Sequence, residues 1–220
     1  LEDAVGGQCW EVLMEVIAHF EVQGWEVEAG YYPTHKLDMC RLLFNDMQTF
    51  CSNLKKAVMK SLCADYELYP PSTAKMEEEC IAAVKKKADD LLSTGKYLHG
   101  EPDNQGRASN FAHHALKNIT LAFYYANTSK CLCQFLEFQE YIPYKALVLI
   151  TAMVHTLLSL FRKYGIDKSA QVNSQDVEEG YIMLNEAISN VLDHPHHSPK
   201  LNMMLVDWAQ MGMYVLIRMD

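Results

Sequence analysis

The segment ALVLITAMVHTLLSLF occupies residues 146–161, and it decides the fold because it is the most apolar stretch of the chain. Four polar residues interrupt it: Thr151, His155, Thr156 and Ser159. At sixteen residues it is shorter than the roughly 20 that a membrane-spanning helix needs. Pro143 suits the first turn of a helix, and Gly165 suits its C-terminal end. We therefore predict a buried central helix over about residues 144–164.

Helical periodicity continues on both sides of this segment, since apolar residues recur at spacings of three and four. Further helical segments are predicted at about 8–20, 35–64, 72–95, 109–126, 131–138, 174–192 and 200–217. No alternating pattern typical of strands persists for more than a few residues. The expected fold is all-α, a single irregular bundle of about seven helices around the helix at 144–164. Residues 1–34 are interpreted as an N-terminal helical extension and 35–220 as the helical domain.

Composition and charge limit the classes of partner. Half of the 220 residues are hydrophobic and 21% are charged, which suits a globular chain with a substantial core. The formal net charge of −9 makes nucleic acid unlikely as a partner and argues against an anionic membrane, because both attract a basic surface. We expect a protein partner.

The cysteine pattern favours a reducing compartment. There are seven cysteines, an odd number, and most fall at apolar positions of helical patterns. We predict free, buried thiols, no disulfide, and an intracellular location in the cytoplasm or nucleus. The closely spaced pair Cys131 and Cys133 is a weak indication of metal binding, since no second pair stands at zinc-finger distance.

The most distinctive polar segment is YLHGEPDNQGRASNFAHHAL, residues 97–116. Its candidate ligand-binding or structural residues are His99, Asp103, Arg107, Asn110 and His113. They form a structured loop if Asp103 makes a turn and Arg107 and Asn110 satisfy backbone carbonyls. Alternatively, Asp103 and the flanking histidines bind a metal ion, or a histidine oriented by Asp103 acts as a general base. These alternatives stay open, and no catalytic residue, metal or cofactor is assigned.

Two observations weigh against chemistry at this loop. His113 and His114 are adjacent on a predicted helix, about 100° apart, so they cannot both point at one ion. Gly100 and Gly106 do not have the spacing of a phosphate-binding P-loop. A nucleophile elbow, a dinucleotide fingerprint and an HExxH motif are also absent from the sequence, and the histidines at 194–197 are interpreted as a solvated connector.

The last predicted helix is apolar on more than one face. It carries four methionines, and Met-rich faces suit either a core or an adaptable interface. The first helix carries the large aromatic residues Trp10 and Phe20. The candidate interface residues are Trp10, Met204, Trp208 and Met211. We predict a two-fold homodimer, and the alternative is that the first helix packs on the last one within a monomer.

Several motifs together resemble a known family. They are Leu54-Lys55, Tyr66-Glu-Leu68-Tyr-Pro70, Tyr97-Leu-His-Gly100, Asp103-Asn-Gln-Gly-Arg107 followed by Asn110 and His113, and Trp208-Ala-Gln-Met-Gly212. In this order they resemble a helical domain of unknown function from mushroom-forming fungi, over roughly residues 36–212. His114 stands where that family has proline. The resemblance implies a single helical domain and assigns no activity.

Two functional hypotheses follow. The first is a helical protein-protein interaction or assembly module of a larger fungal protein, with no defined catalytic activity. The second is a small-molecule-binding or metal-dependent enzyme centred on the 97–114 loop. A deep polar pocket at the loop would favour the second hypothesis, whereas an apolar surface on the first or last helix would favour the first.

Overall fold

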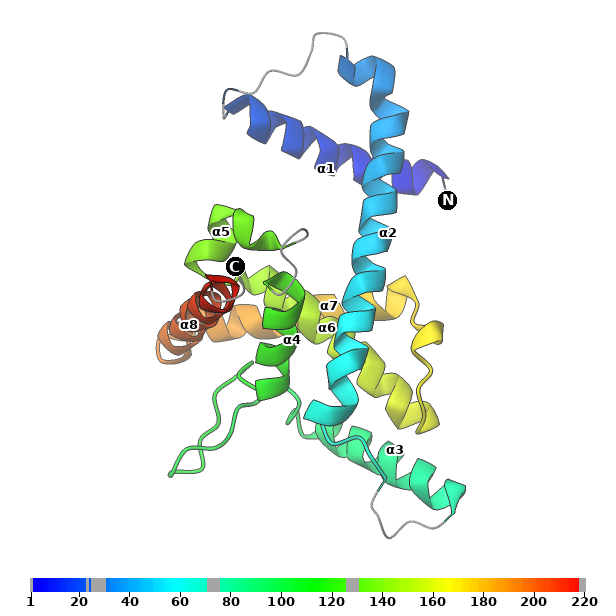
Figure 1. Cartoon of the computed structure of the whole chain (residues 1–220), viewed down its shortest axis with the longest axis vertical. Helices are drawn as coiled ribbons and strands as arrows, with labels where there is room; N and C mark the ends of the chain where they lie inside the picture. Colours follow the sequence, from blue (N-terminus) through cyan, green and yellow to red (C-terminus); the bar gives the residue numbers. More distant parts are fainter. Residues whose placement is uncertain (1, 23, 25–30, 71–75, 126–130, 218–220) are drawn as a thin grey trace. The chain divides into compact units, whose positions relative to one another are not determined.

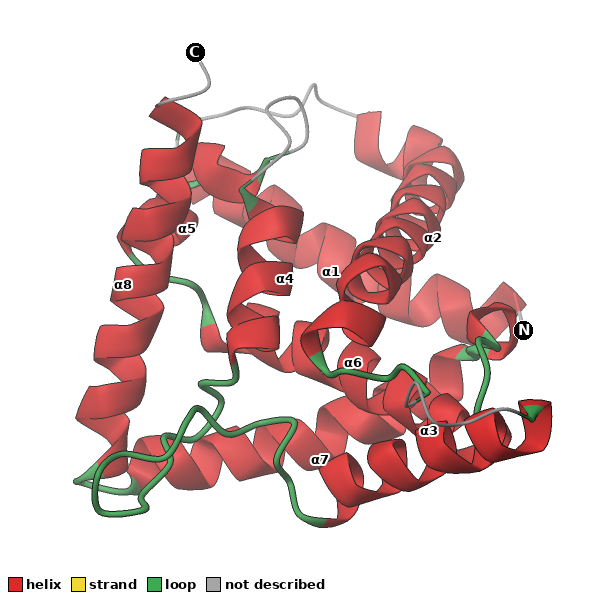
Figure 2. Cartoon of the chain, turned by 60° about the horizontal axis from the view of Figure 1, so that its bottom comes forward, coloured by secondary structure: helices red, strands yellow, loops and turns green. Residues whose placement is uncertain are grey.

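A computed structural model describes residues 2–22, 24, 31–70, 76–125 and 131–217 (Figure 1). For residues 2–10, 31–33 and 215–217 only the backbone is described. The helices are α1 (Glu2–Val22), α2 (Tyr31–Asp65), α3 (Glu77–Ser93), α4 (His114–Tyr124), η1 (Leu132–Gln134), α5 (Leu136–Glu140), α6 (Tyr144–Tyr164), η2 (Ser169–Gln171), α7 (Ser174–Asp193) and α8 (His197–Ile217). No strand occurs in the described ranges, as Figure 2 shows. The predicted all-α fold is confirmed.

The chain forms two compact units. Unit 1 spans Leu1–Asn53 and unit 2 spans Leu54–Asp220, so α2 contributes to both. Unit 1 consists of α1 and the first part of α2, and Leu13 is the one large apolar side chain buried among its described residues. Unit 2 contains the end of α2 and all later helices. The boundary after residue 34 that the sequence suggested remains a prediction.

Helix α6 is the centre of unit 2. It packs against α3, α4 and α7 (Figure 2). Its buried residues are Leu147, Val148, Ile150, Thr151, Ala152, Met153, Val154, Thr156, Leu157, Leu158 and Phe161. The buried hydroxyls of Thr151 and Thr156 donate to the carbonyls of Leu147 and Ala152, four residues earlier, so neither lacks a partner. The predicted central helix is confirmed, and it ends at Gly165, whose φ is +71°.

Among the described residues, α6 is also the single helix that is long and apolar enough to span a membrane. Its most apolar 18-residue window has a mean hydropathy of 1.6, and 61% of that window is buried against the rest of the chain. Burial of this extent is typical of the core helix of a bundle.

Helix α8 packs against α4, α5 and α7 and turns one face inward. Leu201, Leu205 and Trp208 are buried as the periodicity predicts. Met211, predicted to continue this face, is instead 45% exposed, and Gly212 is buried in its place. A Cβ atom at Gly212 would lie 2.5 Å from the ring of Tyr125, so only glycine lets α8 approach this aromatic ring so closely.

Two helix starts differ from the sequence prediction. Helix α4 begins at His114 rather than near residue 109, because buried Phe111 has a φ of +55° and interrupts the helical backbone. Helix α8 begins at His197 rather than near residue 200, with Pro199 in its first turn, where the missing N–H is tolerated. The caps that the sequence suggested before α3, Ser72 and Thr73, lie outside the described residues.

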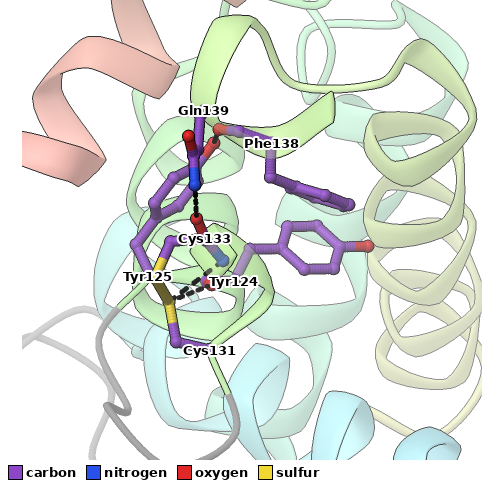
Figure 3. Close-up of a disulfide and its surroundings, with 6 residues drawn as sticks. All are labelled: Tyr124, Tyr125, Cys131, Cys133, Phe138 and Gln139. Atoms are coloured by element: carbon purple, nitrogen blue, oxygen red, sulfur yellow. Dashed lines mark hydrogen bonds between the residues drawn. A yellow bond between two sulfur atoms is a disulfide. The ribbon is translucent and has the colours of Figure 1, made fainter. Parts of the chain in front are cut away.

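A disulfide joins Cys131 and Cys133 between α4 and α5 (Figure 3). The Cys133 N–H donates to Sγ of Cys131 at 3.1 Å, and Nε2 of Gln139 donates to the carbonyl of Cys133 at 3.0 Å. Nearby, the Tyr125 hydroxyl donates to the carbonyl of Phe138 at 2.7 Å. The prediction of seven free thiols is therefore wrong for this pair. The other cysteines whose side chains are described are free: Cys40, Cys51, Cys63 and Cys80.

Candidate functional site

The polar loop between α3 and α4 is anchored at its base. Tyr97 is buried, and its carbonyl accepts a hydrogen bond from the Tyr66 hydroxyl at 3.0 Å. The His113 N–H donates to the carbonyl of Leu98 at 3.3 Å, and the Gly100 N–H donates to the carbonyl of Ser109 at 3.0 Å. These bonds bring the two ends of the loop together.

Asp103 and Arg107 close the tip of the loop. Oδ1 of Asp103 accepts the backbone N–H groups of Gln105 and Arg107, both at 2.9 Å. Oδ2 accepts from Nε and Nη2 of Arg107, both at 3.0 Å. The N–H donors of Arg107 and Gln105 lower the pKa of Asp103. This carboxylate is therefore charged and already occupied by the loop itself.

The Arg107 side chain is 65% exposed, which corrects one expectation from the sequence. It pairs with a carboxylate at the surface and does not satisfy buried backbone carbonyls. An exposed ion pair of this kind contributes little to stability, because water screens it. The guanidinium face that does not contact Asp103 therefore remains accessible for another role.

His113 has a structural role at the start of α4. Its Nδ1 accepts the N–H of Ala115 at 3.1 Å, which caps the helix. Its ring stacks with those of Tyr66 and His114, each with a centroid distance of 4.5 Å. Burial, followed by the neighbouring His114, lowers the pKa of His113 to about 4. The neutral imidazole of His113 therefore caps α4 and stacks with its neighbours, and this structural role requires no catalytic function.

A cavity of about 240 Å³ lies between the loop, the end of α7 and the start of α8. Its lining residues are Glu101, Asp103, Arg107, Ala108, Ser109, Asn110, Ala112, Val191, His196, His197, Lys200, Leu201 and Met204. Of the five candidate residues in the loop, Asp103, Arg107 and Asn110 thus line one site, whereas His99 and His113 do not. Nδ1 of His99 is buried without a hydrogen-bond partner among the described residues.

The start of α8 supplies residues that sequence reasoning missed. The histidines at 194–197 were interpreted as a solvated connector, yet His196, His197 and Lys200 line the cavity. The centroid of the His197 ring lies 4.4 Å from that of His194 and 5.3 Å from that of His196. One pattern in the sequence could have indicated these residues. The segment HPHHSPK, at the start of a helix, places three imidazoles and one ammonium group within seven residues.

Some of the charged side chains around the cavity form ion pairs and others do not. In the described part of the chain, Arg107 and Asp103 neutralise one another, while Lys200 has no carboxylate within salt-bridge distance. Glu101 is exposed at the rim. Partial burial lowers the pKa of His197, and the charges of His194, His196 and Lys200 lower it further. The described residues contain no group of three His, Cys, Asp or Glu side chains that could hold a metal ion, so the metal-dependent alternative has no assembled ligand set there.

The candidate interface residues of the last helix are placed differently from one another. Trp208 is 5% exposed and belongs to the core, Met204 is half-buried in the cavity wall, and Met211 is exposed. The side chain of Trp10 lies outside the described residues.

Unit 1 carries a second candidate surface. Eight large apolar side chains of α1 and the first part of α2 are exposed, and we call them the unit 1 apolar surface: Val12, Met14, Val16, Phe20, Val22, Leu37, Leu42 and Met47. Helical periodicity places Leu13, Val16 and Phe20 on one face of the first helix, but of these three only Leu13 is buried. A two-helix unit has too few surfaces to cover all of its apolar side chains.

Comparison with known proteins places the chain in a family. Residues 4–190 match the family described as Domain of unknown function (DUF6532). This match begins in α1, which the resemblance above had left outside, and ends within α7. No curated protein and no solved structure matches the chain. Because the match covers most of the 220 residues, the chain belongs to the DUF6532 family.

Proposed function

We propose that this chain is a helical protein-interaction module of a larger fungal protein and that it assembles through the unit 1 apolar surface. The observation that supports the proposal is the exposure of eight large apolar side chains on two helices. Soluble proteins rarely leave an extended apolar patch uncovered unless it is a binding surface.

The arrangement of these side chains suits helix packing. Val12, Val16 and Phe20 follow one another at intervals of four residues on α1, so they line one face of the helix. Their exposed fractions are 45%, 43% and 44%, which means that all three are available along the same line. Such a row is the usual contact surface of one helix with another.

A second copy of the chain is the partner that we propose. Unit 1 contributes two helical segments, and two such pairs form a four-helix bundle, in which each helix packs on two neighbours. A two-fold arrangement lets the same patch cover itself, and it is the commonest symmetry of soluble oligomers. The bundle would bury the side chains that a single pair of helices leaves in water.

Light scattering on the 220-residue chain tests the proposal. We expect a mass near twice 25.1 kDa at micromolar concentration, falling toward 25.1 kDa on dilution. Val16→Lys should shift the mass to that of the monomer, because it introduces a charge into the apolar row. Gln48→Lys is the control, since it adds the same charge at an exposed position of α2 in unit 1 that is not part of the unit 1 apolar surface.

A mass of 25.1 kDa that does not change over a tenfold dilution would overturn the proposal. Equal effects of Val16→Lys and Gln48→Lys would also count against it, because they would show that the apolar row has no special role. Such results would favour the alternative that the apolar residues of unit 1 are covered within one chain.

A second candidate function is small-molecule binding, and the cavity beside the 101–112 loop favours it. Neither His99 nor His113 faces this cavity, so the histidines proposed as general bases do not support an enzyme there.

A further inference from the structure

We infer that the cavity between the 101–112 loop and the start of α8 binds a small organic anion, a carboxylate attached to an apolar group. The inference deepens the small-molecule-binding alternative, and it does not depend on assembly through unit 1. It rests on the juxtaposition of cationic side chains with an apolar wall in one cavity.

The cationic side chains that line the cavity come from two distant parts of the sequence. Arg107 is held in place by Asp103, with its Nε and Nη2 each 3.0 Å from Oδ2. Lys200 stands on α8 without a salt bridge in the described ranges, and His196 and His197 lie beside it. An ammonium group and a guanidinium edge near a pair of imidazoles are suitable donors for a carboxylate.

Backbone amides contribute less to this site than the helix start suggests. The N–H groups of His197 and Ser198 both donate to the carbonyl of His194, at 3.1 and 2.9 Å. They are therefore already used within the first turn of α8. The anion must be held by side chains, which makes Lys200 the decisive group.

Much of the remaining lining of the cavity is apolar. Val191 at the end of α7 and Leu201 and Met204 on α8 line it, together with Ala108 and Ala112 from the loop. A volume of about 240 Å³ lies just below the range of about 300–1,000 Å³ that is usual for small-molecule sites. The ligand is therefore small, and part of it is a hydrocarbon or an aromatic ring that covers this apolar wall.

Binding should strengthen at acidic pH, because a bound carboxylate beside His196 and His197 counteracts the burial and the neighbouring charges that lower the pKa of His197. The charged or titratable groups that face these histidines are Glu101, Asp103 and Arg107 from the loop and His194 and Lys200 around the start of α8. From α7 the lining residue is Val191, which carries no charge. At pH 7.5 the two carboxylates offset Arg107 and Lys200, so the attraction for an anionic ligand should grow as acidification protonates His197.

Ligand-detected NMR titration of the 220-residue chain tests the inference with three probes. Benzoate has the carboxylate and the apolar ring, benzamide has the ring without the charge, and inorganic phosphate has charge without the ring. We expect benzoate to bind more tightly than either of the others, and more tightly at pH 5.5 than at pH 7.5. The inference would be overturned if benzamide or phosphate bound as tightly as benzoate. It would also be overturned if benzoate did not bind at about 10 mM, a concentration at which even a very weak complex forms.

Variants locate the binding. Lys200→Gln should weaken benzoate binding by about tenfold, the effect of removing one charged hydrogen bond. Lys145→Gln is the control, because it removes the same charge from an exposed position outside the cavity. Glu101→Gln should strengthen binding, since it removes a competing carboxylate from the rim. Equal affinities of the Lys200→Gln and Lys145→Gln proteins would overturn the inference, while the mass by light scattering separately reports whether the assembly proposal holds.

Discussion

Gly165 offers a sharp test of how unit 2 is packed. This residue ends α6 with a φ of +71°, and a Cβ atom there would lie 2.6 Å from the carbonyl oxygen of Ile81 and 2.7 Å from its Cγ2. The obstacle is partly the backbone of α3, which cannot rotate away as a flexible side chain can. Gly165→Ala therefore meets both an unfavourable backbone conformation and a steric clash between α6 and α3.

The two costs can be estimated separately. A left-handed conformation costs a non-glycine residue about 1–2 kcal/mol. Forcing an extra methyl group into a packed contact costs about 1–3 kcal/mol. The free energy of unfolding should therefore decrease by about 2–5 kcal/mol in Gly165→Ala.

Gly106→Ala is the control that isolates the second cost. Gly106 has a φ of +75°, but nothing lies within 4 Å of a Cβ atom there. Both variants share the left-handed penalty and the same gain from restricting the unfolded chain, so their difference reports the contact with Ile81. Urea denaturation followed by circular dichroism measures both. Equal losses of stability in the two variants would refute the close approach of α6 to α3.

Two further predictions concern pH and oxidation. Because burial and then His114 lower the pKa of His113 from 6.5 to about 4, the unfolded chain binds more protons between these values, and stability should fall as the pH drops from 6.5 toward 4. His113→Gln should flatten this dependence in urea denaturation at pH 7 and pH 5, and an unchanged slope would show that His113 is already charged in the fold. Alkylation under denaturing conditions should label Cys40, Cys51, Cys63 and Cys80 and leave Cys131 and Cys133 unlabelled until a reductant is added. Labelling of these two without reductant would contradict the disulfide.

The elements that the sequence predicted well are those with a strong local signal. The bounds of α6 follow from Pro143, from the apolar stretch and from Gly165, which act within or beside the helix itself. Helix α7 was expected at 174–192 and spans Ser174–Asp193, because Asn173 caps it through a local bond to the Asp176 N–H. Periodicity and caps are properties of neighbouring residues, so one sequence is enough to reveal them.

The cavity could not be predicted in the same way. Arg107 and Lys200 are 93 positions apart, and only the packing of α8 against α4 and α7 brings their surroundings together. The left-handed backbone at Phe111 was equally hidden, because a bulky residue gives no local sign of that conformation. The disulfide was missed because the cysteine pattern was interpreted through its compartment and not through the closeness of residues 131 and 133.

The central position of α6 has a consequence for the synthesis of the protein. Its neighbour α3 leaves the ribosome before it, whereas α7 is complete only 29 residues after the end of α6, from Tyr164 to Asp193. At about 5–20 residues per second this interval lasts about 1.5–6 s. During this interval α6, the most apolar helix of the nascent chain, lacks α7, one of the two helices that it mainly packs against. Translation that stalls between these residues should therefore release an aggregation-prone product, and chaperone binding should be concentrated in this interval.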